Sequence, residues 1–279
     1  MTYKIIGDSC MDLTEETKKD SHFQLIPLTL QIDHASIIDD ETFNQKDFLK
    51  RVKESEECPR SACPSPEMFK EAFSCEADMV FVITLSQHLS GTYNSAMVGK
   101  QMYEEEFGGE KKIHVFSSDS ASVGETLIAF KIRELAEAGA SFEEIVKKAQ
   151  DFLEHIDTYF VLETLDFLKK NGRLTGLTAL LATALNIKPI MQGDGGVIVK
   201  LDQARGIDRA VRKMCDAVIS RVKNPGEKIL AISHCNCPER AQAARDYILE
   251  RISVKEVYLT GMAGVSSLYA GDGGVIICI

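Results

Sequence analysis

The chain has 279 residues, of which 44% are hydrophobic and 27% are charged. This composition excludes a disordered tail and a membrane protein, and the length fits one large domain or two modest ones. Forty-two acidic side chains against 32 basic ones leave a net charge of −10, which disfavours binding to nucleic acid or to anionic membranes. The sequence has no bilayer-spanning apolar run and no signal-peptide pattern, so we expect a cytoplasmic protein.

The first half of the chain alternates β-branched runs with helical patterns, which is typical of a parallel sheet with crossover helices. We expect strands at Tyr3–Ile6, Leu25–Ile32, Met79–Thr84 and Ile113–Phe116, and helices at Thr92–Phe107 and Ser122–Ala138. Ser141 and Glu144 have the spacing of a capping box for a third helix. The proline-rich loop 54–66 excludes a helix or a central strand, and a helix begins near Pro66.

The rhythm changes near Asp157, where we place a boundary between an N-terminal α/β domain (1–157) and a C-terminal mixed α/β domain (158–279). The second domain has two similar segments, GDGGVIVK from Gly193 and GDGGVIIC from Gly271, and each predicts a tight turn that leads into a strand. The expected strands are Thr158–Leu162, Ile187–Met191, Val197–Leu201, Ile229–Ser233, Val254–Leu259 and Val275–Ile279, and the expected helices are Leu177–Leu185, Ile207–Val222 and Pro238–Arg251.

The cysteines and histidines do not predict a metal site. The sequence has eight cysteines and shows no export signal, so we expect reduced thiols and no disulfides. Cys235 and Cys237 are close enough to form a metal-binding pair, but they provide two ligands and a structural zinc ion needs four. No two of the six histidines have ligand spacing. His234 beside Cys235 suggests a thiol nucleophile only weakly, because no other member of a triad is identifiable. We expect no metal and no cofactor.

The segment TLSQHLSGTYNSA from Thr84 is the strongest local feature. An apolar strand ends there in a loop that leads directly into a helix, and the free N–H groups of a helix start attract anions. Ser90, Gly91 and Thr92 are therefore candidates for binding a carboxylate or a phosphate. Ser90 as a simple helix cap is an equally good interpretation. The loop has neither a Walker pattern nor a nucleophile elbow.

A second polar loop, Gly7-Asp8-Ser9-Cys10, follows the first strand. Loops at the carboxyl ends of parallel strands line the ligand crevice, so Asp8, Ser9 and Ser90 could share one mouth. For each residue taken alone, capping of the next helix is the more conservative interpretation. Ser61 in the proline-rich segment is a third candidate hydroxyl, although composition alone does not single it out.

Several segments together resemble one family. They are Gly7-Asp8-Ser9, CPSPEMF from Cys63, LSGTYNSA from Leu89, SDSASVGETLIA from Ser118, LDFLKKNGRLTG from Leu165, LNIKPIM from Leu185 and ARGIDRAV from Ala204. In this order they resemble the DegV family of bacterial fatty-acid-binding proteins over essentially the whole chain.

The resemblance implies a two-domain α/β protein that holds one long-chain fatty acid in an apolar tunnel at the domain junction. It implies a non-enzymatic carrier for phospholipid metabolism that presents the carboxyl group to a separate fatty-acid kinase, which makes the acyl phosphate from ATP. A monomer is our default, and transient membrane contact is compatible with such a role. On this interpretation the helix at residues 177–185 either lines the tunnel or belongs to the core.

The resemblance also implies the binding residues. Ser61 and Ser90 match hydroxyls of the family, Ser90 being the one that contacts the carboxyl group, and Arg173 and Arg205 match two of its arginines. Tyr269 stands where many members have a histidine, so it can hydrogen-bond a carboxylate but does not titrate near neutrality. The full set of expected ligand contacts is Ser61, Ser90, Gly91, Thr92, Tyr269, Ala270 and Gly271, with Asp8, Ser9, Arg173 and Arg205 as head-group or partner contacts.

Two alternatives stay open. One is a hydrolase or phosphotransferase that uses Asp8, Ser90 and an arginine, and it predicts turnover without a partner kinase. The other is a small-molecule sensor that uses the same pocket, although the acidic chain shows no helix-turn-helix signature.

Overall fold

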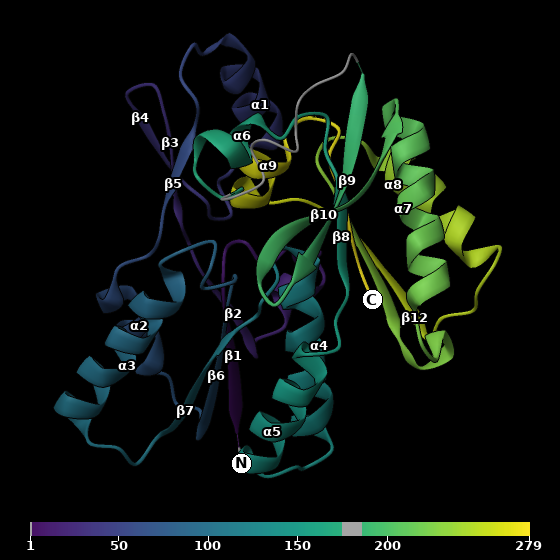
Figure 1. Ribbon diagram of the computed structural model, residues 1–279. Coiled ribbons are helices and arrows are strands. Elements are labelled where there is room, and N and C mark those ends of the chain that lie inside the picture. The colour runs from purple at the N-terminus through teal and green to yellow at the C-terminus, as the bar shows by residue number, and fades with distance from the viewer. Residues whose placement is uncertain (1, 175–185) are drawn as a thin grey trace.

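In the computed structural model, which describes residues 2–174 and 186–279, the strands form three sheets (Figure 1). Sheet A is parallel throughout, with the order β2-β1-β6-β7. Its central strand β6 is an apolar run with every residue buried, as expected for a strand that is covered on both faces. The strands are β1 (Tyr3–Asp8), β2 (Phe23–Ile26), β6 (Met79–Thr84) and β7 (Lys112–Ser117).

Two pairs of helices cover sheet A. Helices α2 (Pro66–Phe73) and α3 (Thr92–Phe107) lie on one face, and α4 (Val123–Glu137) and α5 (Phe142–Leu153) lie on the other (Figure 1). Alternate residues of β6 divide between the two cores, with Val82 facing α2 and α3 and Phe81 facing α4. The predicted capping box of Ser141 and Glu144 is present at the start of α5.

Sheet B is a small antiparallel sheet with the order β4-β3-β5, formed by β3 (Thr29–Ile32), β4 (Ala35–Ile38) and β5 (Arg60–Ala62). The expectation of one strand over Leu25–Ile32 was wrong, because β2 pairs with β1 and β3 pairs with β4 and β5. Pro27 stands between the two strands and has no N–H to continue a ladder. The proline-rich segment contains no central strand, as predicted, but it supplies the edge strand β5, which was not expected. Strand β4 and helix α1 (Gln45–Glu54) were not expected from the sequence.

Sheet C has the order β10-β9-β8-β13-β11-β12 and is mixed, because β11 and β12 are parallel and the other neighbours are antiparallel. Helices α7 (Ile207–Arg221) and α8 (Pro238–Leu249) cover one face (Figure 1). The strands are β8 (Thr158–Val161), β9 (Ile187–Asp194), β10 (Val197–Arg205), β11 (Ile229–His234), β12 (Glu256–Gly261) and β13 (Val275–Cys278).

Helix α4 lies between sheets A and C and packs against β1 and β6 on one side and β11 and β13 on the other. The predicted α/β class, with a parallel N-terminal sheet and a mixed C-terminal one, is confirmed. A division into two domains at Asp157 stays a prediction. Two short helices were missed, α6 (Asp166–Lys170) and α9 (Gly264–Ala270), and the expected helix Leu177–Leu185 lies outside the described residues.

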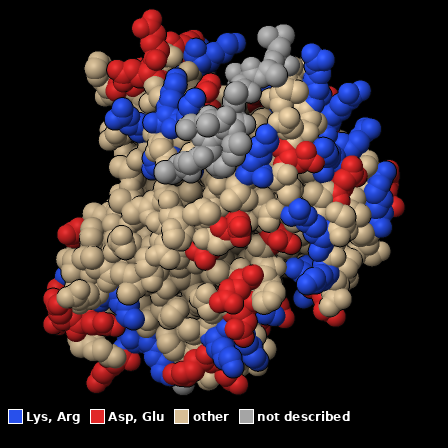
Figure 2. All heavy atoms as spheres, viewed as in Figure 1, with Lys and Arg blue, Asp and Glu red and all other residues tan. Residues whose placement is uncertain are grey.

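The surface is unevenly charged on the face shown in Figure 2. Lysines and arginines gather over the upper and right parts of the molecule, whereas a broad area over α2 and α3 carries few charges. The exposed side chains of Met68, Met97 and Val98 belong to these two helices. Within the described ranges, no helix has both the length and the apolar character needed to cross a membrane.

Candidate functional site

A cavity lies where the carboxyl edge of sheet A meets sheets B and C. It contains about 870 Å³ of space between the atoms, part of which is open to solvent. Of the described residues that line it, Asp119 and Arg173 carry a charge and most of the others are apolar. The aliphatic and aromatic lining residues are Leu28, Leu85, Leu89, Phe160, Leu162, Leu168, Val197, Ile198, Val265 and Ile276.

The parallel sheet positions one side of the cavity. Cys10 follows β1, Leu85 to Ser90 follow β6, and Asp119 to Ser122 follow β7. In parallel sheets the carboxyl ends of neighbouring strands meet at one edge, which is where ligands bind. No role was expected for the segment after β7, although the rule for the ends of parallel strands applies to it as well.

The tip of the β9–β10 hairpin closes another side. Asp194 pairs with Val197, so Gly195 and Gly196 form the predicted two-residue turn, with φ values of 54° and 81°. Ser86 Oγ donates a hydrogen bond of 2.6 Å to the carbonyl of Gly196. This bond joins the loop after β6 to the hairpin, and it holds Val197 and Ile198 over the apolar space.

One rim of the cavity is formed by Ser61, Tyr269 and Arg173. Ser61 Oγ and Tyr269 Oη are hydrogen-bonded at 2.9 Å, and the guanidinium of Arg173 lies 5.3 Å from the centre of the Tyr269 ring. Arg173 is fixed by donating to the carbonyls of Leu89, at 3.1 Å, and of Asn171. Burial raises the pKa of Tyr269, so its hydroxyl is a donor at neutral pH.

Ser90 lines the same cavity and also supports the start of α3. Its Oγ accepts a hydrogen bond of 3.3 Å from Thr92 N–H and lies 2.9 Å from Thr92 Oγ1. The hydroxyl proton of Ser90 can therefore be donated to Thr92 or to a bound ligand. Ser90 is not the cap of α3, because the N-cap residue is Gly91 and none of the described side chains caps this helix. The interpretation of Ser90 as a simple helix cap was therefore wrong.

Not every expected residue reaches the cavity. Asp8 is fully buried, with both carboxylate oxygens accepting backbone N–H groups, and Ser9 Oγ accepts from Leu28 N–H. The shared mouth expected for Asp8, Ser9 and Ser90 is not formed, because these side chains tie the loop after β1 to its neighbours. Cys10 lines the cavity instead.

Among the other expected contacts, Ala270 lines the cavity, whereas Gly91, Thr92 and Gly271 do not. Arg205 is exposed at the last position of β10, whereas Val197, which lines the cavity, is at the first position of that strand. The His234–Cys235 pair gains no support as a nucleophile, because burial raises the pKa of Cys235 to about 12. All eight cysteines are free thiols.

The fold and the cavity define an α/β protein with an apolar pocket and a rim of hydroxyl groups and one guanidinium. The family model for DegV, described as an uncharacterised protein of that family, matches residues 2–279. A DegV domain-containing protein of Streptococcus gordonii is 33% identical over 99% of this chain and 98% of its own length. The chain therefore belongs to the DegV family.

Solved structures of the family have the same fold. A DegV-family protein of Ruminococcus gnavus, refined with vaccenic acid, is 48% identical with a TM-score of 0.97 and full coverage of both chains. The Fatty Acid Kinase (Fak) B3 protein of Streptococcus pneumoniae, loaded with linoleic acid, is 30% identical with a TM-score of 0.90, over 100% of this chain and 99% of its own.

Proposed function

We propose that this protein binds one long-chain fatty acid, with the hydrocarbon in the cavity and the carboxyl group at the rim of Ser61, Ser90 and Tyr269. The observation that carries the proposal is the apolar cavity with hydroxyl donors at one border. The fatty acids named for the Ruminococcus and pneumococcal proteins support it, because their folds superpose over the whole chain.

The energetics fit this ligand. Each buried methylene contributes about 0.8 kcal/mol, so a sixteen-carbon tail offers roughly 10 kcal/mol before the loss of ligand freedom is subtracted. A desolvated carboxylate costs several kcal/mol unless donors satisfy it. Neutral hydroxyls with one nearby guanidinium supply such donors without a bidentate arginine grip, which suits a carrier that must release its cargo.

Handover to a fatty-acid kinase is the second part of the proposal, supported by the name of the pneumococcal relative. The carrier itself would then catalyse no reaction. The alternative enzyme with Asp8 and Ser90 loses support, because Asp8 is enclosed and does not line the cavity. A coupled assay with a fatty-acid kinase should show ATP consumption that depends on the loaded carrier, and the carrier alone should hydrolyse no acyl or phosphate ester.

Mass spectrometry of lipid extracted from the purified protein tests the binding step. We expect one long-chain acid per chain, and a different metabolite would contradict the proposal. Calorimetry with the Ser61→Ala/Ser90→Ala double variant should show at least a tenfold weaker affinity, since two donors are lost at about 1 kcal/mol each. Ser220→Ala, at an exposed site on α7, is the matched control and should leave the affinity unchanged.

A further inference from the structure

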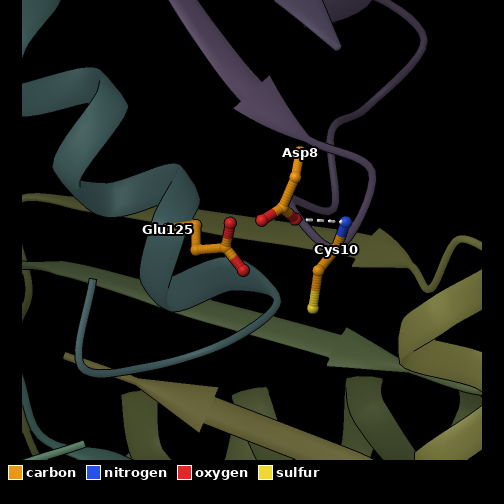
Figure 3. Close-up of side chains that lie close together, drawn as sticks. All are labelled: Asp8, Cys10 and Glu125. Carbon is orange, nitrogen blue, oxygen red and sulfur yellow. Dashed lines mark hydrogen bonds between the residues drawn. The ribbon is translucent and has the colours of Figure 1, made fainter. Parts of the chain in front are cut away.

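Three side chains with metal-binding atoms meet behind the wall of the cavity. Asp8 at the end of β1, Cys10 two residues later and Glu125 in the first turn of α4 place their ligand atoms within 4.8 Å of one another. All three are buried, with exposed fractions of 3% or less. Figure 3 shows the carboxylates of Asp8 and Glu125 turned toward each other, with the thiol of Cys10 beside them.

Glu125 has no hydrogen-bond partner for either carboxylate oxygen, counting the described residues. Buried polar groups are almost always paired, and the polar side chains that interact with Glu125 are those of Asp8 and Cys10, which are ligand groups themselves. Asp8 is different, because its two oxygens accept from the N–H groups of Cys10 and Leu85 at 2.9 and 2.8 Å. Each carboxylate oxygen has a second lone pair, so Asp8 can still bind a cation.

The surroundings of the cluster contain further acid. Asp12 and Asp39 are also buried, and no salt bridge joins Asp8, Asp12, Asp39 or Glu125 to a lysine or arginine in the described parts of the chain. Burial raises the pKa of Asp8 to about 7, and burial together with the charge of Asp8 raises that of Glu125 well above its usual range. Burial and the charge of Glu125 likewise raise the pKa of the Cys10 thiol, so a bound metal has to displace protons from all three groups. A bound cation would stabilise the ionised forms that burial disfavours.

We propose that Cys10 Sγ and the carboxylates of Asp8 and Glu125 form a binding site for a divalent transition metal of the zinc type. A thiolate with two carboxylates favours a borderline ion over Mg²⁺ or Ca²⁺, which take oxygen ligands. Ligand atoms of tetrahedral zinc lie about 3.5 Å apart, so a contraction of about 1 Å would close the observed cluster around an ion.

The cavity supplies the entry path and the fourth position. Cys10 and Ser122, which flank the cluster, both line the cavity, so an ion or a metal-bound water can reach the thiol from that side. Spacing of histidines and cysteines did not reveal this site, because its ligands come from β1 and α4, more than a hundred residues apart. The site differs from the Ser61–Tyr269 rim, and its test does not depend on lipid binding.

The test begins with delipidated, reduced full-length protein that has been stripped of metal with a chelator. Titration with Zn²⁺ should show one equivalent bound with release of protons, measured as a dependence of the calorimetric enthalpy on the buffer. Titration with Co²⁺ should give a thiolate-to-metal charge-transfer band in the near ultraviolet. Absence of stoichiometric binding, or binding without that band, would overturn the proposal.

Variants separate this site from adventitious binding by other cysteines. Cys10→Ser and Glu125→Gln should each weaken Zn²⁺ binding by more than the roughly 10- to 100-fold typical for residues that only support a ligand. Cys215→Ser is the control, because Cys215 is equally buried but lies in the core of sheet C. Equal binding by Cys10→Ser and Cys215→Ser would overturn the proposal. Thermal melting identifies a variant that fails to fold, and the remaining ligand variant then decides.

Discussion

The cavity borders two polar regions of opposite character. At the rim, Ser61, Ser90 and Tyr269 are partly exposed and neutral, and Arg173 adds a positive charge. Behind the wall, Asp8 and Glu125 belong to an enclosed group of acids without a basic partner in the part of the chain described.

The difference separates two kinds of energetic role. The rim groups keep contact with water when no ligand is bound, so changing them alters ligand affinity more than stability. The enclosed acids were dehydrated when the chain folded, so changing them or the pH alters the free energy of unfolding. Each of the following predictions tests that separation, beginning with the apolar wall between the two regions.

The largest effect is expected for Ile198→Glu on the wall formed by β10. Its carboxylate would lie unpaired in the space for the hydrocarbon, at a cost of about 3 kcal/mol or more, which corresponds to at least a 100-fold loss of lipid affinity. Val199→Glu is the control, because Val199 is the next residue of β10 and does not line the cavity. Calorimetry with a long-chain acid would contradict the cavity assignment if both variants bound equally well.

The enclosed acids predict a pH dependence of stability, which Asp39 illustrates. Its carboxylate accepts from the N–H groups of Gly264 and Val265 at 2.7 and 2.8 Å, and burial raises its pKa to about 6. The folded state therefore binds a proton more tightly than the unfolded chain. This contribution to stability is complete below about pH 4 and is lost as the pH rises to about 6, amounting to at most about 3 kcal/mol.

Asp39→Asn should remove that part of the pH dependence. Chemical unfolding of the wild type between pH 4 and 7 should show a steeper decline than the variant does. The variant should also be less stable at low pH by about 1–3 kcal/mol, because an amide cannot accept from both N–H groups with its single oxygen. Identical slopes in the two proteins would show that Asp39 titrates in the folded state as it does in the unfolded one.

The hairpin tip tests how the cavity is closed. An alanine Cβ at Gly196 would lie 2.7 Å from Ser86 Oγ and 2.9 Å from Asp119 Oδ1, at a φ of 81°. At Gly195 the φ is 54°, and a Cβ would meet nothing within 4 Å. Gly195→Ala should cost only the backbone term of about 1 kcal/mol, and Gly196→Ala should cost more and speed lipid release. Equal melting temperatures and release rates would contradict the packing of this tip.

The sequence predicted those features that local chemistry determines. The apolar run Met79–Thr84 predicted a strand, and the Ser141–Glu144 pair predicted a helix start, and both predictions are confirmed. Features that depend on contacts between residues far apart in the sequence could not be predicted from it. The segment GVSSLYA contains poor helix formers, and α9 begins where Asp39 accepts from its first N–H groups. Its identification requires knowing that residues 225 positions apart are in contact.

The candidate site divides in the same way. Ser90 could be found because it follows a strand in a parallel sheet, and Ser61 and Tyr269 were proposed from the family resemblance. The hydrogen bond between Ser61 and Tyr269 is a tertiary contact between sheet B and α9, and the sequence alone does not predict it. Glu125 stands among apolar residues of α4, and only the arrangement of β1 beside α4 shows that its carboxylate lacks a partner.

The smallest effect is expected at the rim, for Tyr269→Phe. The phenylalanine ring can still pack against the Arg173 guanidinium, but the hydroxyl is lost. Lipid affinity should therefore fall by about 1 kcal/mol, or roughly fivefold, and the melting temperature should change little.

Because Ser61 and Tyr269 share a hydrogen bond, the affinity losses of Ser61→Ala and Tyr269→Phe should not be additive. A double-mutant cycle should give a coupling energy of about 0.5–1.5 kcal/mol. Additive losses of affinity would mean that each hydroxyl acts on the ligand independently. A large loss of stability in either variant would mean that the rim residues contribute to folding as the enclosed acids do, which would contradict the distinction between the two regions.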